Sequence, residues 1–246
     1  MSKYFKQKFA REGYFKIEGV VDKKEIINLS KDIKKSKNVD IYRDRNNKIR
    51  RIERIYNKSK NLRKINILFI NLIKKYLGIK VLIFKDKFNL KPPGGEGFSS
   101  HYDGVFYFID SKNKKRKGWY EYGNIFLSVL LSLDNSNERN GTIEIAKAHK
   151  NSFNKLLKNT KNDGTPNLLK KIEKNLKFEN VNLKAGDILI FKNTCPHRSR
   201  KNTSNTSRRI LYYTYLSDKF GDQYQRYFKD KVTSKNKTSK SLSGQI

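Results

Sequence analysis

From Val81 onward the sequence consists of short segments rich in β-branched and aromatic residues, separated by turn signals such as PPGG at 92–95 and Asn140-Gly141. Such residues favour strands, and such turns favour connections between neighbouring strands. Many short strands predict a mainly β fold, an antiparallel sandwich or jelly roll with flanking helices. The segments expected to be strands are 81–91, 97–108, 124–134, 141–146, 187–193 and 208–216.

The first third of the chain is expected to be helical around one strand. Residues 13–20 alternate like a strand, and Asp22 with Glu25 forms a capping-box pattern that opens a helix over 23–36. A second helix is expected over 61–77, where apolar residues recur at helical spacing before a glycine.

The chain is expected to form one domain, because 246 residues fit one large domain and no internal repeat is present. An insertion over 151–180 contains a predicted helix near 166–176, whereas the highly charged residues 39–59 fit no element. The expected organisation is a single domain over 1–231, with a helical part at 1–78 and a β core at about 80–217, followed by a mobile basic tail at 232–246.

The formal net charge is +33, from 56 Lys and Arg against 23 Asp and Glu. Such a charge fits a protein that binds nucleic acid or a membrane surface. It also fits a compositional bias, because the lysines are spread along the chain rather than gathered into one stripe. Under either interpretation the charge is expected to attract anionic small molecules.

A cytoplasmic location is expected. The longest apolar runs, 66–73 and 125–133, are too short to cross a bilayer, and residues 1–15 lack the apolar core of a signal peptide. The single cysteine excludes an internal disulfide, which favours a reducing compartment. Cys195 itself is expected to be a small buried apolar residue.

His101 and Asp103 are two residues apart in an aromatic, apolar stretch. On a strand their side chains project from the same face, while Tyr102 faces the other way. Burying such a pair is unfavourable unless the two groups are hydrogen-bonded or bind a metal. The pair alone is also explained by a buried histidine that is hydrogen-bonded to a nearby carboxylate.

His197 favours the metal interpretation. It follows the predicted strand 187–193, and with His101 and Asp103 it gives two imidazoles and one carboxylate. This 2-His-1-carboxylate set holds non-haem Fe(II) and leaves coordination positions open. His149 has no carboxylate at ligand spacing, so we expect it to be structural or to lie at the mouth of the site.

Four blocks of the sequence together resemble the Fe(II)/2-oxoglutarate dioxygenases of the phytanoyl-CoA dioxygenase type. The resemblance covers about 80–216 and implies a double-stranded β-helix (cupin-like) core with iron at one end. It also implies a reaction with O₂ and 2-oxoglutarate that gives succinate, CO₂ and a hydroxylated product. The blocks are HYD (101–103), GTIEIAKAHK (141–150), AGDILIFKN (185–193) and HRSRKNTSNTSRRILYYTY (197–215).

The resemblance also implies roles for single residues. His101, Asp103 and His197 match the iron ligands, and Arg208 matches the arginine that grips the distal carboxylate of 2-oxoglutarate. A guanidinium fork suits a carboxylate because it binds both oxygens and stays charged. Arg209 alternates to the opposite face of the strand and is the weaker candidate.

Three further positions match residues around the co-substrate. Ser199 matches a hydroxyl that often assists the arginine, and Asn89 matches a position that contacts the co-substrate in some members. Lys87 lies on the same strand face as Asn89 and is a further candidate. Since Asp103 keeps the carboxylate that related halogenases lack, the resemblance implies hydroxylation or a related oxidation.

Two features bear on the substrate. The stretch KFNLKPPGGEGFSSHYD (87–103) resembles the corresponding stretch of the 2-aminoethylphosphonate hydroxylases. A basic loop over 109–122 carries Trp119 and Tyr120, whose aromatic faces suit an ammonium, while its cations suit an anion. The same loop is also explained as a solvated surface segment. Further candidate substrate ligands are Lys91 and Arg198 near the mouth of the site.

The sequence thus predicts an Fe(II)/2-oxoglutarate oxygenase that hydroxylates a small anionic or zwitterionic molecule, with an aminoalkylphosphonate as the leading case. A carboxylate or betaine metabolite fits the same cations. A dioxygenase acting on nucleic acid through its basic surface is a second alternative, and a binding protein without activity is a third. The sequence predicts no oligomeric state.

Overall fold

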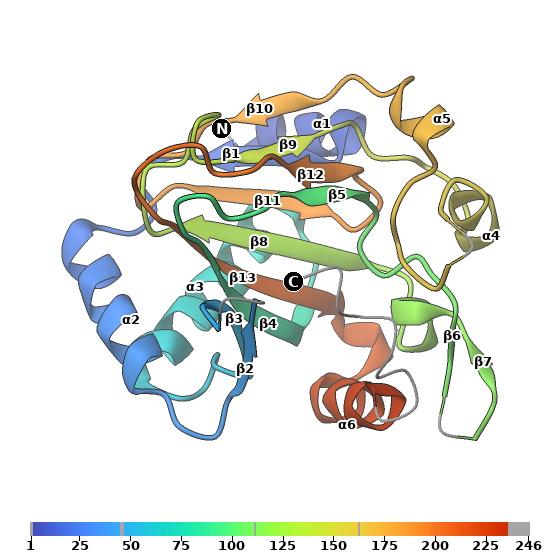
Figure 1. The fold of residues 1–246 in the computed structure, drawn as a ribbon, viewed down its shortest axis with the longest axis horizontal. Coiled ribbons are helices and arrows are strands. Elements are labelled where there is room, and N and C mark those ends of the chain that lie inside the picture. Colours follow the sequence, from blue (N-terminus) through green and yellow to red (C-terminus); the bar gives the residue numbers. More distant parts are fainter. Residues whose placement is uncertain (1, 45–46, 111, 162, 236–246) are drawn as a thin grey trace.

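The computed structural model describes residues 2–44, 47–110, 112–161 and 163–235 (Figure 1). Its helices are α1 (Ser2–Glu12), α2 (Lys23–Lys35), α3 (Lys60–Leu77), α4 (Phe153–Leu157), α5 (Lys170–Glu173) and α6 (Tyr224–Lys235), with the 3-10 helices η1 (Gly118–Glu121) and η2 (Asp218–Phe220). Its strands are β1 (Tyr14–Ile17), β2 (Asp40–Arg43), β3 (Ile49–Glu53), β4 (Val81–Lys91), β5 (Phe98–His101), β6 (Phe108–Ile109), β7 (Lys115–Arg116), β8 (Phe126–Ser132), β9 (Ile143–Ile145), β10 (Glu179–Val181), β11 (Ile188–Lys192), β12 (His197–Ser199) and β13 (Arg208–Ser217).

These strands form two main sheets in which every neighbouring pair is antiparallel. The larger sheet has seven strands in the order β1-β11-β8-β13-β4-β3-β2, and the smaller has four in the order β10-β9-β12-β5. A separate two-stranded ribbon joins β6 to β7. In Figure 1 the smaller sheet runs along the upper side of the larger one. The predicted mainly β, jelly-roll architecture is confirmed.

The centre of the larger sheet is buried on both faces. On β8, Val129 and Leu131 belong to the apolar cluster that includes Phe69 of α3. The residue between them, Leu130, packs instead with Ile145 of the smaller sheet. Burying a side chain of this size contributes about 1.5–3 kcal/mol, so both layers stabilise the central strands. Side chains that point from the larger sheet toward the smaller sheet are therefore carried by strands that are packed on both faces.

The predicted helix boundaries in the N-terminal part are confirmed. At the start of α2 the Asp22 carboxylate accepts a hydrogen bond from the Glu25 N–H at 2.7 Å, and the Asp22 N–H donates back to the Glu25 carboxylate at 3.4 Å. Helix α3 starts after Ser59, which caps it, and ends at Gly78, whose φ is 71°. A left-handed residue at this position favours glycine and ends the helix.

Three segments differ from the sequence prediction. Residues 39–59, for which the sequence indicated no element, contain the β2–β3 hairpin, which extends the larger sheet beyond β4. The predicted strand 97–108 ends at His101, because the chain turns at Gly104, where φ is 77°. A Cβ there would lie 2.4 Å from Trp119, so this turn requires glycine.

The predicted helix over 166–176 is reduced to the four residues of α5. The preceding residues are extended instead, because Asn167 forms a β-bridge with His101 and the Leu168 N–H donates to the Ser100 carbonyl. Tertiary pairing with the strand that carries the candidate ligands thus outweighs the local helical pattern.

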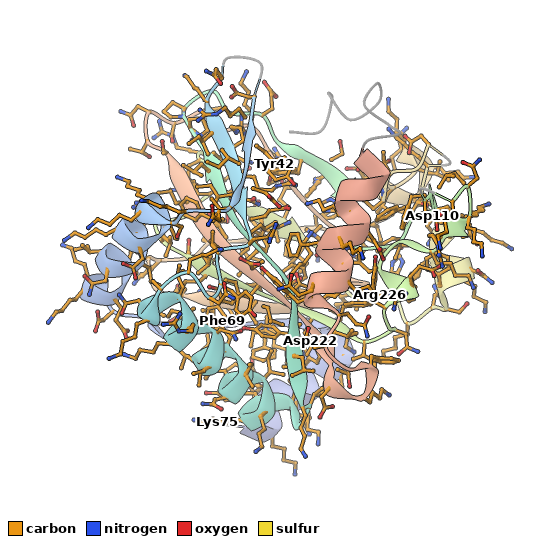
Figure 2. All side chains as sticks on the ribbon, turned by 90° about the horizontal axis from the view of Figure 1, so that it is seen from below. Tyr42, Phe69, Lys75, Asp110, Asp222 and Arg226 are labelled. Atoms are coloured by element: carbon orange, nitrogen blue, oxygen red, sulfur yellow. The ribbon has the colours of Figure 1, made fainter. Side chains whose placement is uncertain are left out.

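Helix α6 lies across one side of the molecule, beside the β2–β3 hairpin that carries Tyr42 (Figure 2). A buried ion pair between Lys231 of α6 and Glu53 of β3 joins the two elements. Residues 232–235, predicted as the start of the tail, belong to α6, and the remainder of that tail lies outside the described residues. None of the helices described is both long and apolar enough to cross a membrane.

Candidate functional site

The three predicted metal ligands meet where β5 and β12 pair. His101 ends β5, Asp103 follows it by two residues, and His197 begins β12 directly opposite His101. One ligand atom from each lies within 4.8 Å of the other two. Over the described ranges this is the sole group of three or more His, Cys, Asp or Glu side chains at such spacing.

Backbone carbonyls orient both imidazoles. The Nδ1 of His101 lies 2.7 Å from the Ser99 carbonyl, and the Nδ1 of His197 lies 3.0 Å from the Cys195 carbonyl. Since a carbonyl only accepts, each Nδ1 carries the proton and each Nε2 is free to bind a metal. The Asp103 carboxylate accepts a hydrogen bond from the Ser128 hydroxyl at 3.3 Å.

Burial keeps the ligands in the protonation states that a metal requires. It lowers the pKa of His101 to about 3, and it also lowers the pKa of His197. Burial alone would raise the pKa of Asp103, but His197, Lys87 and His101 outweigh it and hold that pKa below its usual value. Two neutral imidazoles and one carboxylate are the donor set that suits non-haem Fe(II).

Asn193 holds the backbone around Asp103. The Asp103 N–H donates to the Asn193 carbonyl at 3.0 Å, and the Asn193 side-chain amide donates back to the Asp103 carbonyl at 3.2 Å. This role was not predictable from the sequence, because it depends on contacts between residues 90 positions apart. These bonds tie the third ligand to the end of β11.

The side chains expected to be structural are structural. Tyr102 faces away from the metal ligands into a buried cluster, and its hydroxyl lies 2.5 Å from His149 Nδ1. The His149 side chain thus contacts the opposite side of the strand from the ligands. Cys195 is fully buried, and burial raises the pKa of its thiol to about 12.

The metal ligands open into a cavity of about 890 Å³. Its wall is strongly basic, with three acidic residues (Asp44, Glu96 and Asp103) against nine basic ones. The basic residues are Arg43, Lys48, Arg50, Arg51, Lys85, Lys87, Arg198, Arg208 and Lys231. Anions should therefore be attracted to this cavity in particular, whatever the origin of the charge on the rest of the surface.

Arg208 lines this cavity at the start of β13 and is 3% exposed. Its Nε is buried without a hydrogen-bond partner, and burial lowers its pKa to about 10, so the side chain stays charged. Arg209 points the other way and makes a two-pronged ion pair with Asp134. A buried guanidinium with an unsatisfied Nε, in the same cavity as the ligands, fits the carboxylate of a co-substrate.

The two β4 candidates lie on the same strand face and line the cavity. Asn89 has a buried side-chain oxygen without a hydrogen-bond partner. Lys87 pairs with Tyr212 of the neighbouring strand β13, and its ammonium lies 4.6 Å from the centre of the Tyr212 ring. Burial lowers the pKa of Lys87 to about 7, although the nearby Asp103 carboxylate acts in the opposite direction.

Ser199 lines the cavity but does not assist Arg208 directly. Its hydroxyl accepts a hydrogen bond from Lys91 Nζ at 2.8 Å. The prediction of Lys91 as a substrate ligand needs correction, because its ammonium also donates to the carbonyls of Gly141 and Arg200 and it does not line the cavity. Lys91 instead cross-links the strands behind the site.

The structure separates the two aromatic candidates. Trp119 lines the cavity, and its ring lies 5.1 Å from the Lys85 ammonium. Tyr120 is directed away from the cavity, where its hydroxyl accepts a hydrogen bond from the Asn193 amide and its ring packs on Phe153. Tyr120 is therefore not positioned to contact a substrate, which corrects that prediction.

Arg198 lines the cavity, but its guanidinium is already paired with Glu144 and Glu173. Its predicted role as a substrate ligand would require at least one of these pairs to open. The pairs are made at 2.7 and 2.8 Å, so Arg198 is a weaker anion ligand than the cations without acidic partners.

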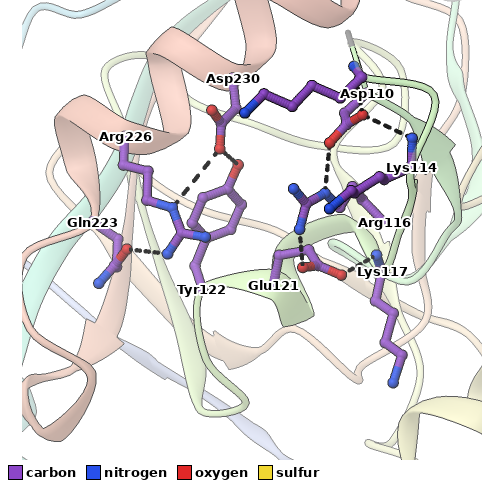
Figure 3. Close-up of polar contacts among 10 residues, drawn as sticks. Asp110, Lys114, Arg116, Lys117, Glu121, Tyr122, Gln223, Arg226 and Asp230 are labelled. Atoms are coloured by element: carbon purple, nitrogen blue, oxygen red, sulfur yellow. Dashed lines mark hydrogen bonds and ion pairs between the residues drawn. The ribbon is translucent and has the colours of Figure 1, made fainter.

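The cations of the 109–122 loop lie away from the cavity. Figure 3 shows Arg116 between Asp110 and Glu121, and Tyr122 bonded to Asp230 of α6. No lysine from 112–117 is among the cavity-lining residues, so the predicted use of these cations for an anionic substrate is not supported. The loop instead attaches to α6 and contributes Trp119 to the wall.

Sequence reasoning missed Arg51 and Lys85. Arg51 lies on β3, opposite Asn89, within the segment that the sequence left unassigned. Its Nε is buried without a hydrogen-bond partner. Lys85 lies on the cavity face of β4, and the alternation of Lys85, Lys87 and Asn89 was a signal that could have found it.

Comparison with known proteins agrees with this geometry. The profile of the family "Phytanoyl-CoA dioxygenase (PhyH)" matches residues 9–210. The 2-aminoethylphosphonate dioxygenase of an uncultured bacterium (HF130_AEPn_1) is 32% identical over 161 residues, which are 65% of this chain and 55% of the relative. The methylphosphonate hydroxylase of Gimesia maris is 28% identical over 159 residues, 64% of this chain and 54% of the relative. The chain thus spans about half the length of these curated relatives.

Solved structures show the same fold. The 2-oxoglutarate-dependent carbocyclase SnoK from nogalamycin biosynthesis superposes with a TM-score of 0.69 at 14% identity, covering 88% of this chain and 84% of SnoK. EctD from S. alaskensis, solved with 2-oxoglutarate and 5-hydroxyectoine, gives a TM-score of 0.68 at 18% identity, covering 89% and 77%. Profile match and fold agree: the chain belongs to the phytanoyl-CoA dioxygenase family.

Proposed function

We propose that this protein is an Fe(II)- and 2-oxoglutarate-dependent oxygenase that hydroxylates a small organophosphonate on the carbon next to phosphorus. The observation that carries the proposal is the opening of the His101–Asp103–His197 set into a cavity whose wall has nine basic residues. Family membership supports the reaction class, and the two curated relatives that act on phosphonates support the substrate class.

The residues present fit both the metal and the co-substrate. The two Nε2 atoms and the Asp103 carboxylate would hold the iron, and the unsatisfied Arg208 guanidinium would receive the distal carboxylate of 2-oxoglutarate. Bound iron(II) supplies the activation of O₂ that accompanies oxidative decarboxylation of 2-oxoglutarate. Asn89, with its unsatisfied buried oxygen, lies on the neighbouring strand and would complete the polar contacts there.

The substrate would be held by cavity cations of β3 and β4, next to Asn89. Lys87 and Arg51 would bind the phosphonate oxygens and turn the adjacent carbon toward the metal ligands. In the balanced reaction a C–H bond becomes C–OH, one oxygen atom of O₂ enters this hydroxyl, and the other enters succinate. Carbon dioxide leaves from the 2-oxoglutarate carboxylate.

The test is anaerobic reconstitution with Fe(II) and 2-oxoglutarate, followed by O₂ and a panel of phosphonates, carboxylates and betaines. We expect a phosphonate to stimulate both O₂ uptake and succinate release, and a new hydroxyl next to phosphorus in the NMR spectrum of the product. His101→Ala and Asp103→Ala should abolish turnover. Stimulation by a carboxylate or a nucleobase, and by no phosphonate, would contradict the proposed substrate class while leaving the reaction class intact.

A further inference from the structure

The proposed function leaves open whether the substrate carries an amine. On the basis of that function, we infer that the site selects a phosphonate without an ammonium group, such as an alkyl- or hydroxyalkylphosphonate, over an aminoalkylphosphonate or another zwitterion. The inference follows from which cations, carboxylates and aromatic rings of the cavity wall already have partners within the protein.

Among the cavity-lining cations of β3 and β4, Arg50 pairs with Asp44 and Lys85 donates to the Tyr227 hydroxyl, whereas Lys87 and Arg51 lack acidic partners that would fully satisfy them. Lys87 makes no hydrogen bond or ion pair with any described residue. Arg51 reaches Glu53 at 3.5 Å through one terminal nitrogen, while its buried Nε stays without a hydrogen-bond partner. The two side chains lie on adjacent strands, because Arg51 pairs with Asn89 and Glu53 pairs with Lys87 in the β3–β4 register. Together they form a subsite for a compact anion of two charges.

The acidic residues that line the cavity are committed elsewhere. Asp103 is a metal ligand in the proposed function, and Asp44 is paired with Arg50 at 3.5 Å. Glu96 is paired with Lys201 at 3.2 Å. An ammonium entering the described part of this cavity would therefore meet no carboxylate that lacks a cationic partner.

Four of the five aromatic rings that line the cavity lie near the protein's own cations, including Phe98 beside Lys91, and the fifth, Phe106, packs on Phe108. The Lys85 ammonium lies 5.1 Å from the centre of the Trp119 ring and 5.3 Å from that of Tyr227. The Lys87 ammonium covers Tyr212 at 4.6 Å. A substrate ammonium would have to displace these lysines, or lie beside them with like charge, so among the described cavity-lining rings only Phe106 has a face without a cation of the protein.

A phosphonate dianion has the opposite relation to the same residues. It would give Lys87 and Arg51 the partners that they lack and would reduce the repulsion among the cations around them. Adding an ammonium to that dianion brings back a positive charge where the wall is already positive. The cations of the wall thus attract the phosphonate dianion and repel an added ammonium, and both effects favour a phosphonate without an ammonium group.

The experiment is calorimetric titration of the anaerobic Fe(II)–2-oxoglutarate protein with propylphosphonate and with 2-aminoethylphosphonate. These two molecules have the same number of non-hydrogen atoms and are compared at one pH near neutrality, with each affinity corrected for the fraction of the phosphonate that is dianionic at that pH. We expect propylphosphonate to bind at least about tenfold more tightly. Equal affinity, or tighter binding of the aminophosphonate, would overturn the inference.

Lys87→Met links this preference to the wall. This substitution should weaken propylphosphonate binding by about tenfold or more. It should also bring the dissociation constants of propylphosphonate and 2-aminoethylphosphonate closer together, because the Tyr212 ring becomes available to an ammonium. Lys192→Met is the matched control, since Lys192 also lies over an aromatic ring, Phe9 at 4.9 Å, but does not line the cavity. A ratio unchanged by Lys87→Met would contradict the assignment.

The proposed function and the inference fail in different ways. Binding of 2-oxoglutarate without binding of either phosphonate would refute the anion subsite at Lys87 and Arg51. The proposed reaction class, a 2-oxoglutarate-dependent oxygenase, would not be affected by that result. Absence of metal-dependent 2-oxoglutarate binding would instead refute the proposed function. Lys87→Gln provides a second neutral variant if the methionine variant does not fold.

Discussion

Arg208 and Arg209 are adjacent in the sequence but have opposite surroundings. Arg208 faces the cavity with an unsatisfied Nε, whereas Arg209 is paired with Asp134 on the other face of the sheet. We predict that Arg208→Ala raises the 2-oxoglutarate concentration needed for half-maximal turnover by at least about thirtyfold, because a buried charge-assisted partner is worth about 2–5 kcal/mol. The measurement is succinate release at varied 2-oxoglutarate, with Fe(II) binding determined in parallel and expected to be unchanged.

Arg209→Ala is the control for this prediction. It removes an ion pair on the far face and should lower the free energy of unfolding without changing the 2-oxoglutarate requirement. If both variants raised the requirement equally, the alternation of side chains along β13 would not explain co-substrate binding.

His149 is the histidine that the geometry places outside the metal site. Its ring contacts the Tyr102 hydroxyl on the opposite side of the strand from the ligands. We predict that His149→Ala retains one Fe(II) per chain and loses about 0.5–2 kcal/mol of unfolding free energy with the lost hydrogen bond. Metal analysis after gel filtration, together with urea unfolding, measures both. Complete loss of iron would require a different ligand set.

The sequence predicted residues of this site to the extent that local spacing encodes them. The two-residue interval of His101 and Asp103 and the alternation at Arg208 are local patterns, and His197 was found through the family resemblance of its segment. Arg51 was missed because its role depends on β3 joining β4, which is a long-range pairing. Lys91 was misassigned because the carbonyls of Gly141 and Arg200, which accept its hydrogen bonds, are distant in the chain and were not visible as its partners in the sequence.

At the scale of elements, Asp86 on β4 connects three segments. Its carboxylate accepts hydrogen bonds from the N–H groups of Ile55 and Tyr56 and from the Tyr224 hydroxyl of α6. Burial raises the pKa of Asp86 to about 6, although these hydrogen bonds oppose the shift. A carboxyl whose pKa is raised by folding stabilises the protein at low pH, and this contribution is lost as the pH rises through the folded pKa.

The prediction compares the protein with Asp86→Asn, which cannot titrate. The unfolding free energy of the unaltered protein minus that of the variant should fall by on the order of 3 kcal/mol between about pH 4 and pH 7. Urea unfolding of both proteins at several pH values measures this difference and cancels the titration of all other groups. If this difference in unfolding free energy is constant or rises with pH, folding does not raise the pKa of Asp86.

Elements with strong local signals were predictable, and elements fixed by tertiary pairing were not. The capping box at Asp22 and the glycine at the end of α3 are local devices, and both are present as expected. The β2–β3 hairpin was not visible because both strands are short and charged, and because β2, at the sheet edge, is half-exposed. The helix expected over 166–176 was mostly replaced by extended chain that pairs with β5.

For the whole molecule, anion binding through the net charge of +33 and anion binding in the basic cavity are distinguished by their dependence on salt. Exposed charges are screened within about 10 Å at 0.1 M salt, whereas buried ones are screened much less. We predict that oligonucleotide binding, seen at low salt, is lost by about 0.3 M salt, while phosphonate binding in the cavity weakens far less. Fluorescence anisotropy and calorimetry at varied salt test this. Salt-resistant, sequence-dependent oligonucleotide binding would favour the nucleic-acid alternative.

The overall architecture was predictable because it rests on composition and turn spacing, which are distributed along the whole chain. The mainly β core and its flanking helices were expected, and both are found. The sequence did not reveal how α6 and the 109–122 loop join through Tyr122 and Asp230, since this contact links residues 108 positions apart. The part of the cavity wall that the 109–122 loop forms therefore depends on contacts between distant segments of the chain.

In the function proposed for this chain, oxidation of 2-oxoglutarate is coupled to hydroxylation of a phosphonate at the His101–Asp103–His197 site. The decisive experiment is turnover under ¹⁸O₂ with Fe(II), 2-oxoglutarate and an alkylphosphonate, followed by mass spectrometry of both products. We expect one labelled oxygen in succinate and one in the new hydroxyl, and neither product from Asp103→Ala. A hydroxyl that carries oxygen only from water, or succinate formed at the same rate by Asp103→Ala, would contradict the proposed function.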